Sequence, residues 1–219
     1  MTTITDQTTA PVDAGAWGRL SAALYNPVLW AGEVAGMSAR RRDLVTLARG
    51  RTLELGSGTG LNVPHYPRDL DELILAEPAA PMRRRLEDAV RRSDAPATVL
   101  DAPAERLPIA DGSVDTVVST LVLCTVDDPV VVLDEVRRVL RPDGQLLFLE
   151  HVRSDSARLA RWQDRLETPW RRFAVGCRCN RATLAAIEAA GFTVQRRREA
   201  KWRGMPAIVR PIVMGSAAP

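Results

Sequence analysis

Short apolar runs alternate with amphipathic segments through the middle of the chain. The apolar runs 51–55, 72–76, 98–100, 116–120 and 145–150 are bounded by polar or turn-forming residues, as buried strands are. Segments with helical periodicity lie between them at 80–92 and 129–140. Strands that alternate with helices at this spacing predict βαβ units and a mostly parallel sheet covered on both faces.

The segment 129–140 carries the clearest helix signals. Asp127 or Asp128 can cap its first turn, Pro129 suits the first helical position, and the turn-forming residues 141–144 end it. Its apolar stripe consists of Val132, Val136, Val139 and Leu140.

The two ends of the chain depart from the alternating pattern. Residues 16–47 have a helical pattern, broken near Asn26–Pro27, and residues 1–15 are polar and predict a disordered leader. Near the other end, 192–195 and 207–214 are strand-like and are joined through Gly204 and Pro206, which predicts an antiparallel hairpin. We therefore expect one domain over 16–219, with cap helices at 16–47, a ligand-binding core at 48–150, and further helices and the hairpin at 151–219.

Composition excludes several classes of protein. The chain has 219 residues, 46% hydrophobic and 26% charged, which is typical of one soluble globular domain. The net charge is only +3, aromatic residues make up 5%, and the arginine triplets 40–42, 83–85 and 196–198 are scattered. A nucleic-acid groove needs concentrated positive charge with stacking aromatics. We therefore interpret the triplets as solvated faces and expect no nucleic-acid partner.

The start of the chain lacks the features of a targeting segment. It has no basic stretch followed by an apolar one, and the apolar segment Leu20–Met37 is interrupted by Pro27 and Glu33. We expect a cytoplasmic protein with no stable membrane insertion, and the sequence leaves the oligomeric state open.

A glycine-rich loop follows the first apolar run. Ligands of open α/β sheets bind at the carboxyl ends of strands, where glycines let a ligand lie against bare backbone. Leu61 stands where the dinucleotide fingerprint requires glycine, which disfavours a nucleotide-dependent oxidoreductase, and there is no Gly-Lys-Ser/Thr of a P-loop. The candidate binding residues here are Glu54, Gly56, Ser57, Gly58, Gly60 and Asn62.

Glu77 ends the second apolar run, about twenty residues beyond the glycine loop, where dinucleotide-binding folds place an acidic residue. A carboxylate there can accept hydrogen bonds from both hydroxyls of a ribose, and this interpretation is favoured over that of a solvated loop residue.

The block Asp101-Ala-Pro-Ala-Glu-Arg-Leu-Pro-Ile-Ala-Asp-Gly-Ser-Val-Asp115 precedes the fourth strand. With the glycine loop and Glu77, it resembles class I S-adenosylmethionine-dependent methyltransferases of the type 11 group. The resemblance implies a single-domain Rossmann-like class I methyltransferase fold: a mostly parallel seven-stranded sheet with a C-terminal antiparallel hairpin and N-terminal cap helices.

The same resemblance implies S-adenosylmethionine as cofactor and S-adenosylhomocysteine as product. The family holds the adenine through the start of this block, often with an acidic side chain that here is Pro103, so Asp101 or Glu105 would have to substitute. The further cofactor-binding residues that it implies are Pro78, Met82, Ala102, Pro103, Ala104, Glu105, Thr120 and Leu121.

Three more segments, 119–126, 136–144 and 149–152, are similar to one branch, the methyltransferase-like proteins that methylate alkyl thiols, and its bacterial relatives. This similarity implies a small hydrophobic acceptor, such as a thiol. O-, N- or C-methylation of a lipid or secondary metabolite stays open, as does a non-catalytic module that keeps the fold for binding.

The acceptor side offers few titratable groups. His151 follows the fifth strand and Cys124 follows the fourth, which makes both candidate catalytic residues, although a histidine is as often structural and a cysteine is by default a small buried hydrophobe. The residues expected to line the acceptor site are Tyr25, Trp30, His65, Trp162 and Trp170, whose aromatic members fit core packing equally well.

Cys177 and Cys179 form a C-x-C pair, which is too little for a zinc site, so no metal is expected. If Cys124 converges with them, however, three thiols can bind trivalent arsenic, as in arsenite methyltransferases. Arsenite methylation therefore remains a minority alternative.

Overall fold

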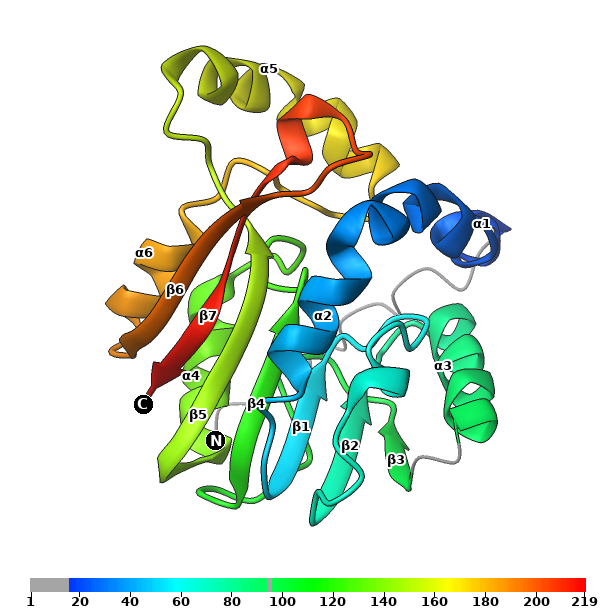
Figure 1. The fold of residues 1–219 in the computed structure, drawn as a ribbon, viewed down its shortest axis with the longest axis vertical. Coiled ribbons are helices and arrows are strands. Elements are labelled where there is room, and N and C mark those ends of the chain that lie inside the picture. The colour runs from blue at the N-terminus through cyan, green and yellow to red at the C-terminus, as the bar shows by residue number, and fades with distance from the viewer. Residues whose placement is uncertain (1–15, 94–95) are drawn as a thin grey trace, which may run out of the picture.

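The computed structural model describes residues 16–93 and 96–219, and the leader predicted for 1–15 lies outside them. Seven strands form one sheet in the order β3-β2-β1-β4-β5-β7-β6. All neighbouring pairs are parallel except those of β7, which runs antiparallel to both β5 and β6 (Figure 1). The predicted seven-stranded, mostly parallel sheet with an antiparallel C-terminal pair is confirmed.

The strands are β1 (Arg51–Leu55), β2 (Glu72–Ala76), β3 (Ala97–Leu100), β4 (Val114–Thr120), β5 (Leu140–His151), β6 (Thr193–Lys201) and β7 (Pro211–Ala218). The α-helices are α1 (Ala16–Gly32), α2 (Ser38–Val45), α3 (Ala80–Ser93), α4 (Pro129–Val139), α5 (Ala157–Phe173) and α6 (Thr183–Ala189). Three short helices complete the elements: η1 (Glu33–Met37), η2 (Val63–His65) and η3 (Ala207–Val209).

Alternate residues of the central strands enter two separate cores, one on each face of the sheet. In β5, Leu146 and Phe148 pack into the core that also contains Val132 and Val136 of α4. Leu147 and Leu149 pack into the opposite core, with Leu44 of α2 and Leu86 of α3. This two-sided burial explains why the strands read as continuous apolar runs.

Helix α4 forms as the sequence predicts. Asp128 caps it, because its Oδ1 accepts a hydrogen bond from the backbone N–H of Val130 at 2.8 Å. Its apolar stripe is buried, although Leu140 already belongs to β5, which starts five residues before the predicted position.

The expected helix break near Asn26–Pro27 is wrong. Helix α1 continues through Pro27, and the non-helical residue is Gly36, with φ of 116°. A proline costs a helix one backbone hydrogen bond. A left-handed glycine redirects the chain itself, and it turns α2 away from α1.

The strand predicted over 207–214 is also different. Residues Ala207–Val209 form the short helix η3, and β7 begins at Pro211. β6 extends to Lys201, well past the predicted end, because an edge strand paired on one side tolerates exposed charged residues such as Arg196–Arg198.

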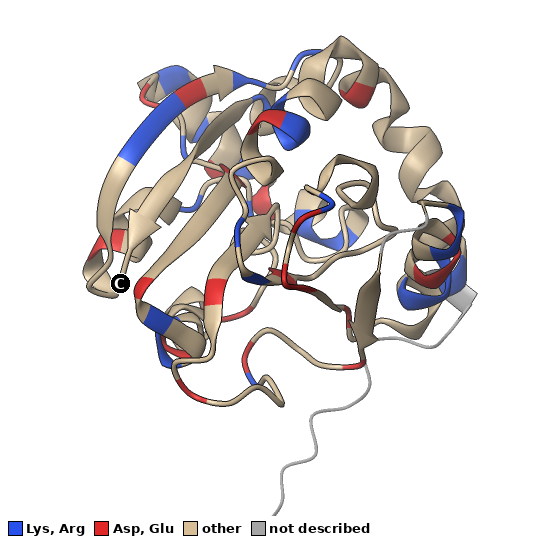
Figure 2. Cartoon of the chain, turned by 60° about the horizontal axis from the view of Figure 1, so that its bottom comes forward, with Lys and Arg blue, Asp and Glu red and all other residues tan. Residues whose placement is uncertain are grey.

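Basic and acidic residues are spread over several elements, as Figure 2 shows. The triplet 196–198 lies exposed on β6, in agreement with the interpretation as a solvated face. Within the arginine triplets Arg41 is the buried exception, because it is only 4% exposed. None of the helices in the described part of the chain reaches the length and apolarity that a bilayer crossing requires.

Candidate active site

A cavity of about 480 Å³ lies at the carboxyl ends of the parallel strands. Helix α1, the end of α5 and the connection between β6 and β7 lie above these strand ends (Figure 1) and contribute to its walls. This size suits a cofactor together with a small second ligand. The residues around it are predominantly apolar.

Two of these covering elements are packed tightly together. A Cβ added to Gly204, in the β6–β7 connection, would lie 2.7 Å from the carbonyl oxygen of Ala31 in α1. A Cβ on Gly32 would overlap the indole of Trp202. The glycines therefore allow α1 and this connection to meet, and together they form a roof over the cavity.

The three glycines of the loop after β1 have different roles. All have positive φ, from 50° to 83°. A Cβ on Gly56, which lines the cavity, would overlap Val122 at 2.9 Å, and one on Gly60 would overlap Ala89 of α3 at 2.8 Å, so both glycines allow close packing. A Cβ on Gly58 would meet nothing closer than 3.9 Å, and Gly58 lines the cavity. Bare backbone thus faces open space at the position where a cofactor would lie.

Glu77 follows β2 and borders the same space. Its Oε2 accepts a hydrogen bond from the N–H of Gly58 and its Oε1 accepts one from the N–H of Ala79, both at 2.8 Å. Burial raises the pKa of Glu77, and these two N–H donors oppose that shift. Each carboxylate oxygen keeps a lone pair for a ligand hydroxyl. The fixed carboxylate beside Gly58 fits the ribose of S-adenosylmethionine.

The opposite wall of this part of the cavity comes from the segment after β3. Pro103, Ala104 and Glu105 line it, and Ala102 is buried behind them. Of the two acidic residues considered as substitutes for the family's carboxylate, Glu105 lies at the cavity. Asp101 instead forms an ion pair with Arg83 at 2.7 Å, outside it.

Pro78, Met82 and Leu121 also line the cavity, as expected. Leu121 adopts a φ of 60°, which is unusual for a residue with a side chain. Its N–H donates to the carbonyl of Leu149 in β5, which holds it in this conformation.

Other residues predicted to bind the cofactor lie beneath the loop, away from the cavity surface. Asn62 donates through Nδ2 to Glu54 Oε1 at 2.6 Å and to Thr120 Oγ1 at 3.0 Å. Sequence reasoning missed two further members, Tyr66, which donates to Glu54 Oε2, and Arg41, which donates to Asn62 Oδ1. Burial raises the pKa of Glu54 to about 7, against the lowering effect of its hydrogen bonds. This hydrogen-bond network supports the glycine-rich loop on the side away from the cavity.

Ser57 and Gly60 are likewise buried and absent from the cavity lining. The N–H of Ser57 donates to the carbonyl of Ala76, and the N–H of Gly60 donates to the carbonyl of Ser57. These bonds set the shape of the loop, so that for these residues contact with the cofactor stays a prediction.

At the far end of the cavity lie His151, Trp202 and Trp170. The His151 ring stacks on Trp202, with ring centres 5.5 Å apart. Burial lowers the pKa of His151 to about 4, partly offset by the carbonyls of Pro211 and Val209. Among the described residues, His151 Nδ1 and the indole nitrogens of Trp170 and Trp202 have no hydrogen-bond partner. Buried polar atoms without partners at a cavity indicate where a ligand can bind.

Glu150, next to His151, fixes the floor at this end. Its Oε1 accepts hydrogen bonds from Ser119 Oγ and from the N–H groups of Val122 and Leu123, and its Oε2 accepts one from the N–H of Cys124. The sequence pointed to His151 here and missed Glu150, since a single acidic residue at a strand end carries no distinctive pattern.

Cys124 also lines the cavity, and its Sγ lies 3.9 Å from that of Cys177. Within residues 16–93 and 96–219, no three or more His, Cys, Asp or Glu side chains are placed to hold a metal ion. The three cysteines therefore do not form the single cluster that arsenite binding would require.

The aromatic residues predicted to line the acceptor site divide into two groups. Tyr25 and Trp170 lie at the cavity, and burial raises the pKa of Tyr25 to about 12. Trp30 and Trp162 are 67% and 47% exposed and do not line it. The helical period of α5 placed Trp162 on one stripe with Trp170, but only the last turns of the helix reach the cavity.

His65 lies in η2 beside α2, where its Nε2 is 3.4 Å from Ser38 Oγ. Burial and the charges of Arg42 and Arg41 lower its pKa. It is a contact between the cap helices and the core rather than part of the cavity wall.

Four apolar residues at the rim of the cavity are not among the predicted site residues. Leu20, Leu24 and Val28 of α1 and Phe173 at the end of α5 line the cavity while remaining about half exposed. Such an apolar rim has no sequence signal of its own, because exposed leucines on an amphipathic helix look the same wherever the helix packs.

Comparisons with known proteins agree with this geometry. Residues 53–148 match the family model described as Methyltransferase domain. The human protein named Thiol S-methyltransferase TMT1B is 38% identical over 197 residues, which cover 83% of this chain and 79% of the relative. The human Thiol S-methyltransferase TMT1A is 34% identical over 169 residues, or 75% and 69% of the two chains.

A solved structure of a possible histamine N-methyltransferase from Thermotoga maritima superposes with a TM-score of 0.67 at 21% identity. The match covers 91% of this chain and 96% of that one. At this identity the likeness concerns the fold alone.

Proposed function

We propose that this chain, which belongs to the class I S-adenosylmethionine-dependent methyltransferases and there to the branch of the thiol S-methyltransferases, methylates the sulfur of a small apolar thiol. The observation that carries the proposal is one continuous cavity. It joins Gly58 and Glu77 at one end to Cys124, His151 and an apolar rim at the other.

S-adenosylmethionine supplies an activated methyl group, so the protein's task is to hold and align the two reactants. Glu77 would accept the ribose hydroxyls, and Gly58 would let the cofactor lie against the backbone. Ala104 and Glu105 would border the adenine. The buried network of Glu54 and Asn62 would keep the loop in this shape.

The acceptor would occupy the end near Cys124 and His151. The walls there are mostly apolar, with Trp170, Trp202 and Met205 among them. An apolar wall favours an apolar acceptor by about 0.8 kcal/mol for each buried methylene group. It also excludes water, which strengthens electrostatic interactions within the site.

The pKa of His151 argues against its use as a strong base. A cysteine thiol ionises near pH 8.5 and a simple alkyl thiol only at higher pH, so a base with a pKa of about 4 lies at least roughly 4–5 units below, which makes full proton transfer to it unfavourable by about 6 kcal/mol or more. His151 is neutral at physiological pH, and its open Nδ1 can accept a hydrogen bond that orients the acceptor. The thiol would lose its proton to solvent, at a cost of about 1.4 kcal/mol for each pH unit below the pKa of the thiol.

The test is methyl transfer from labelled S-adenosylmethionine to matched acceptors of one carbon skeleton. Hexanethiol, hexanol, hexylamine and arsenite would be compared at equal concentration. We expect turnover with the thiol alone, rising toward alkaline pH as the thiol ionises. Faster turnover with the alcohol, the amine or arsenite would overturn the thiol assignment, and the cofactor assignment would stand.

A further inference from the structure

Two cysteines lie side by side in the wall of the cavity. Cys124 follows β4 and Cys177 follows α5, 53 residues later in the chain, and their Sγ atoms are 3.9 Å apart. Both line the cavity, and their exposed fractions are 1% and 8%. They are screened from bulk solvent, while a small molecule that enters the cavity can reach them.

The backbone around this pair is already joined. The N–H of Arg178 donates to the carbonyl of Cys124 at 2.7 Å, and the N–H of Cys124 donates to Glu150 Oε2. A disulfide needs its two sulfurs about 2.05 Å apart. Since the flanking backbone is in contact, side-chain rotation can supply most of the remaining approach.

The segment before Cys177 has an unusual conformation. Val175 has a φ of 49° and Gly176 has a φ of 93°. A left-handed conformation is costly for a β-branched residue such as valine. The strained residue lies two positions before Cys177, and this short connection can relax by moving when a new bond forms.

The two thiols are chemically unequal. Contact with Cys124 lowers the pKa of Cys177, against the effect of burial. Contact with Cys177 and burial raise the pKa of Cys124 well above its usual value. One sulfur thus ionises first and the other keeps its proton, which is the division between an attacking and a resolving thiol.

We propose that Cys124 and Cys177 form a reversible oxidation site, at which a hydroperoxide closes a disulfide across the acceptor end of the cavity. The site does not depend on which acceptor the enzyme methylates.

The chemistry balances with hydrogen peroxide as oxidant. The Cys177 thiolate attacks one peroxide oxygen, the O–O bond breaks, and water leaves after protonation, which yields a sulfenic acid. Cys124 then attacks that sulfur, the S–O bond breaks, and a second water leaves with the thiol proton. Two thiols lose two electrons in total, and one peroxide is reduced to two waters.

Closure would change the acceptor end and leave the cofactor end alone. Cys177 is linked through Gly176 and Val175 to Ala174 and Phe173, which line the cavity, so its displacement moves the wall there. Gly58 and Glu77 belong to other elements. The oxidised enzyme should therefore lose turnover while it still binds S-adenosylhomocysteine.

Cys179 provides an internal control. It is fully buried and does not line the cavity, and burial raises its pKa to about 12. An oxidation that followed mere proximity in sequence would join Cys177 to Cys179, whereas the proposed site excludes Cys179.

The experiment treats the full chain with hydrogen peroxide, removes the excess with catalase, blocks free thiols with N-ethylmaleimide and maps disulfides by peptide mass spectrometry. We expect one intramolecular link between Cys124 and Cys177, a blocked Cys179, and loss of most turnover. A phosphine should restore turnover; a thiol reductant is unsuitable because thiols are the proposed acceptors.

Variants separate the link from general damage. Cys179→Ala should form the link as the wild type does, and Cys124→Ala should form none and keep its remaining turnover after peroxide. A link that includes Cys179, a link between two chains, or no link in the wild type would overturn the proposal. So would equal loss of turnover in Cys124→Ala. Because the link is detected by mass, a failure of the thiol assignment does not affect this test.

Discussion

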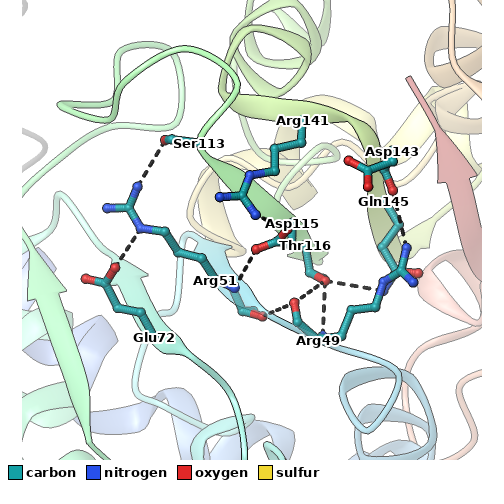
Figure 3. Close-up of polar contacts among 10 residues, drawn as sticks. Arg49, Arg51, Glu72, Ser113, Asp115, Thr116, Arg141, Asp143 and Gln145 are labelled. Carbon is teal, nitrogen blue, oxygen red and sulfur yellow. Dashed lines mark hydrogen bonds and ion pairs between the residues drawn. The ribbon is translucent and has the colours of Figure 1, made fainter.

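The two ends of the parallel sheet differ in whether their polar groups find partners within the protein. At the amino end, polar groups of neighbouring strands hydrogen-bond to one another (Figure 3). Asp115 accepts the N–H of Arg51 at 2.8 Å and the guanidinium of Arg141 at 2.6 Å, and Arg51 also reaches Glu72 and Ser113. These contacts tie neighbouring strands together at this end of the sheet.

At the carboxyl end, polar groups are left open around a cavity. His151 Nδ1 and the Trp170 and Trp202 indole nitrogens lack partners within the described residues, and Gly58 faces empty space. Glu77 is held by only two backbone donors. A similar inventory of charged and small residues therefore stabilises the fold at one end and leaves binding capacity at the other, according to whether the groups pair with each other.

The largest effect should come from comparing the loss of each of two carboxylates, which lie at opposite ends of β2. Glu77→Ala should weaken S-adenosylhomocysteine binding by about 1.5–3 kcal/mol, because hydrogen bonds to a charged group are lost. Glu72→Ala, at the amino end of β2, removes only a half-exposed ion pair with Arg51 and should leave affinity unchanged. Isothermal titration calorimetry measures both. Equal losses would show that Glu77 acts through folding and does not contact the ribose.

The next largest effect is expected from comparing two glycines that have the same backbone conformation. Gly58 and Gly112 both have a φ of 55°, and a Cβ on either finds open space. Gly58→Val should lower cofactor affinity at least tenfold, about 1.4 kcal/mol, because its side chain would occupy the cavity. Gly112→Val carries similar strain away from the cavity and should bind normally. Normal binding by Gly58→Val would move the cofactor site elsewhere.

A smaller effect is expected at the amino end, and in stability alone. Asp115→Ala removes acceptors from the Arg51 N–H and from Arg141, and should lower the free energy of unfolding by about 1 kcal/mol. Urea denaturation measures it, and Asp143→Ala is the control because Asp143 enters the network through its carbonyl. Cofactor affinity that fell together with stability would contradict the division between the two ends.

The smallest effect should follow from His151→Gln. A neutral hydrogen-bond acceptor is kept, so turnover with a thiol should fall by less than tenfold, under about 1.4 kcal/mol. The pKa of about 4 leaves His151 unprotonated above pH 5, so neither enzyme should show an inflection near pH 6.5. Both should accelerate toward the pKa of the thiol. An inflection near 6.5 that disappears in the variant would instead identify His151 as the general base.

Predicted site residues that lie next to strand ends were placed at the cavity more reliably than those chosen by residue type. Gly58, Glu77 and Ala104 belong to segments next to strand ends, and any parallel sheet brings such segments to one edge. The local sequence pattern was therefore enough to predict that these residues lie at this edge of the sheet. Trp30, Trp162 and His65 were chosen by residue type and helical period, and the structure places them outside the cavity wall.

Long-range pairing explains what was missed. Arg41 looked like one of three exposed arginines, but it contacts Glu33 and Asn62 and is buried. Trp202 and Met205 reach the cavity only because Gly204 lets their connection meet α1. Except for the Arg41–Glu33 ion pair, these contacts join segments far apart in the chain, and periodicity within one segment does not determine such contacts.

Local patterns in the chain were enough to predict the succession of strands and helices, the glycine loop, the acidic residue that follows β2, and membership of a methyltransferase family. These features depend on local spacing and on burial patterns that repeat along the chain. The packing of distant elements settles that Gly58 has open space beside it, that Asp101 pairs away from the cavity, and that Cys124 meets Cys177. Those outcomes depend on how elements pack against one another, and packing is set by the whole set of contacts at once.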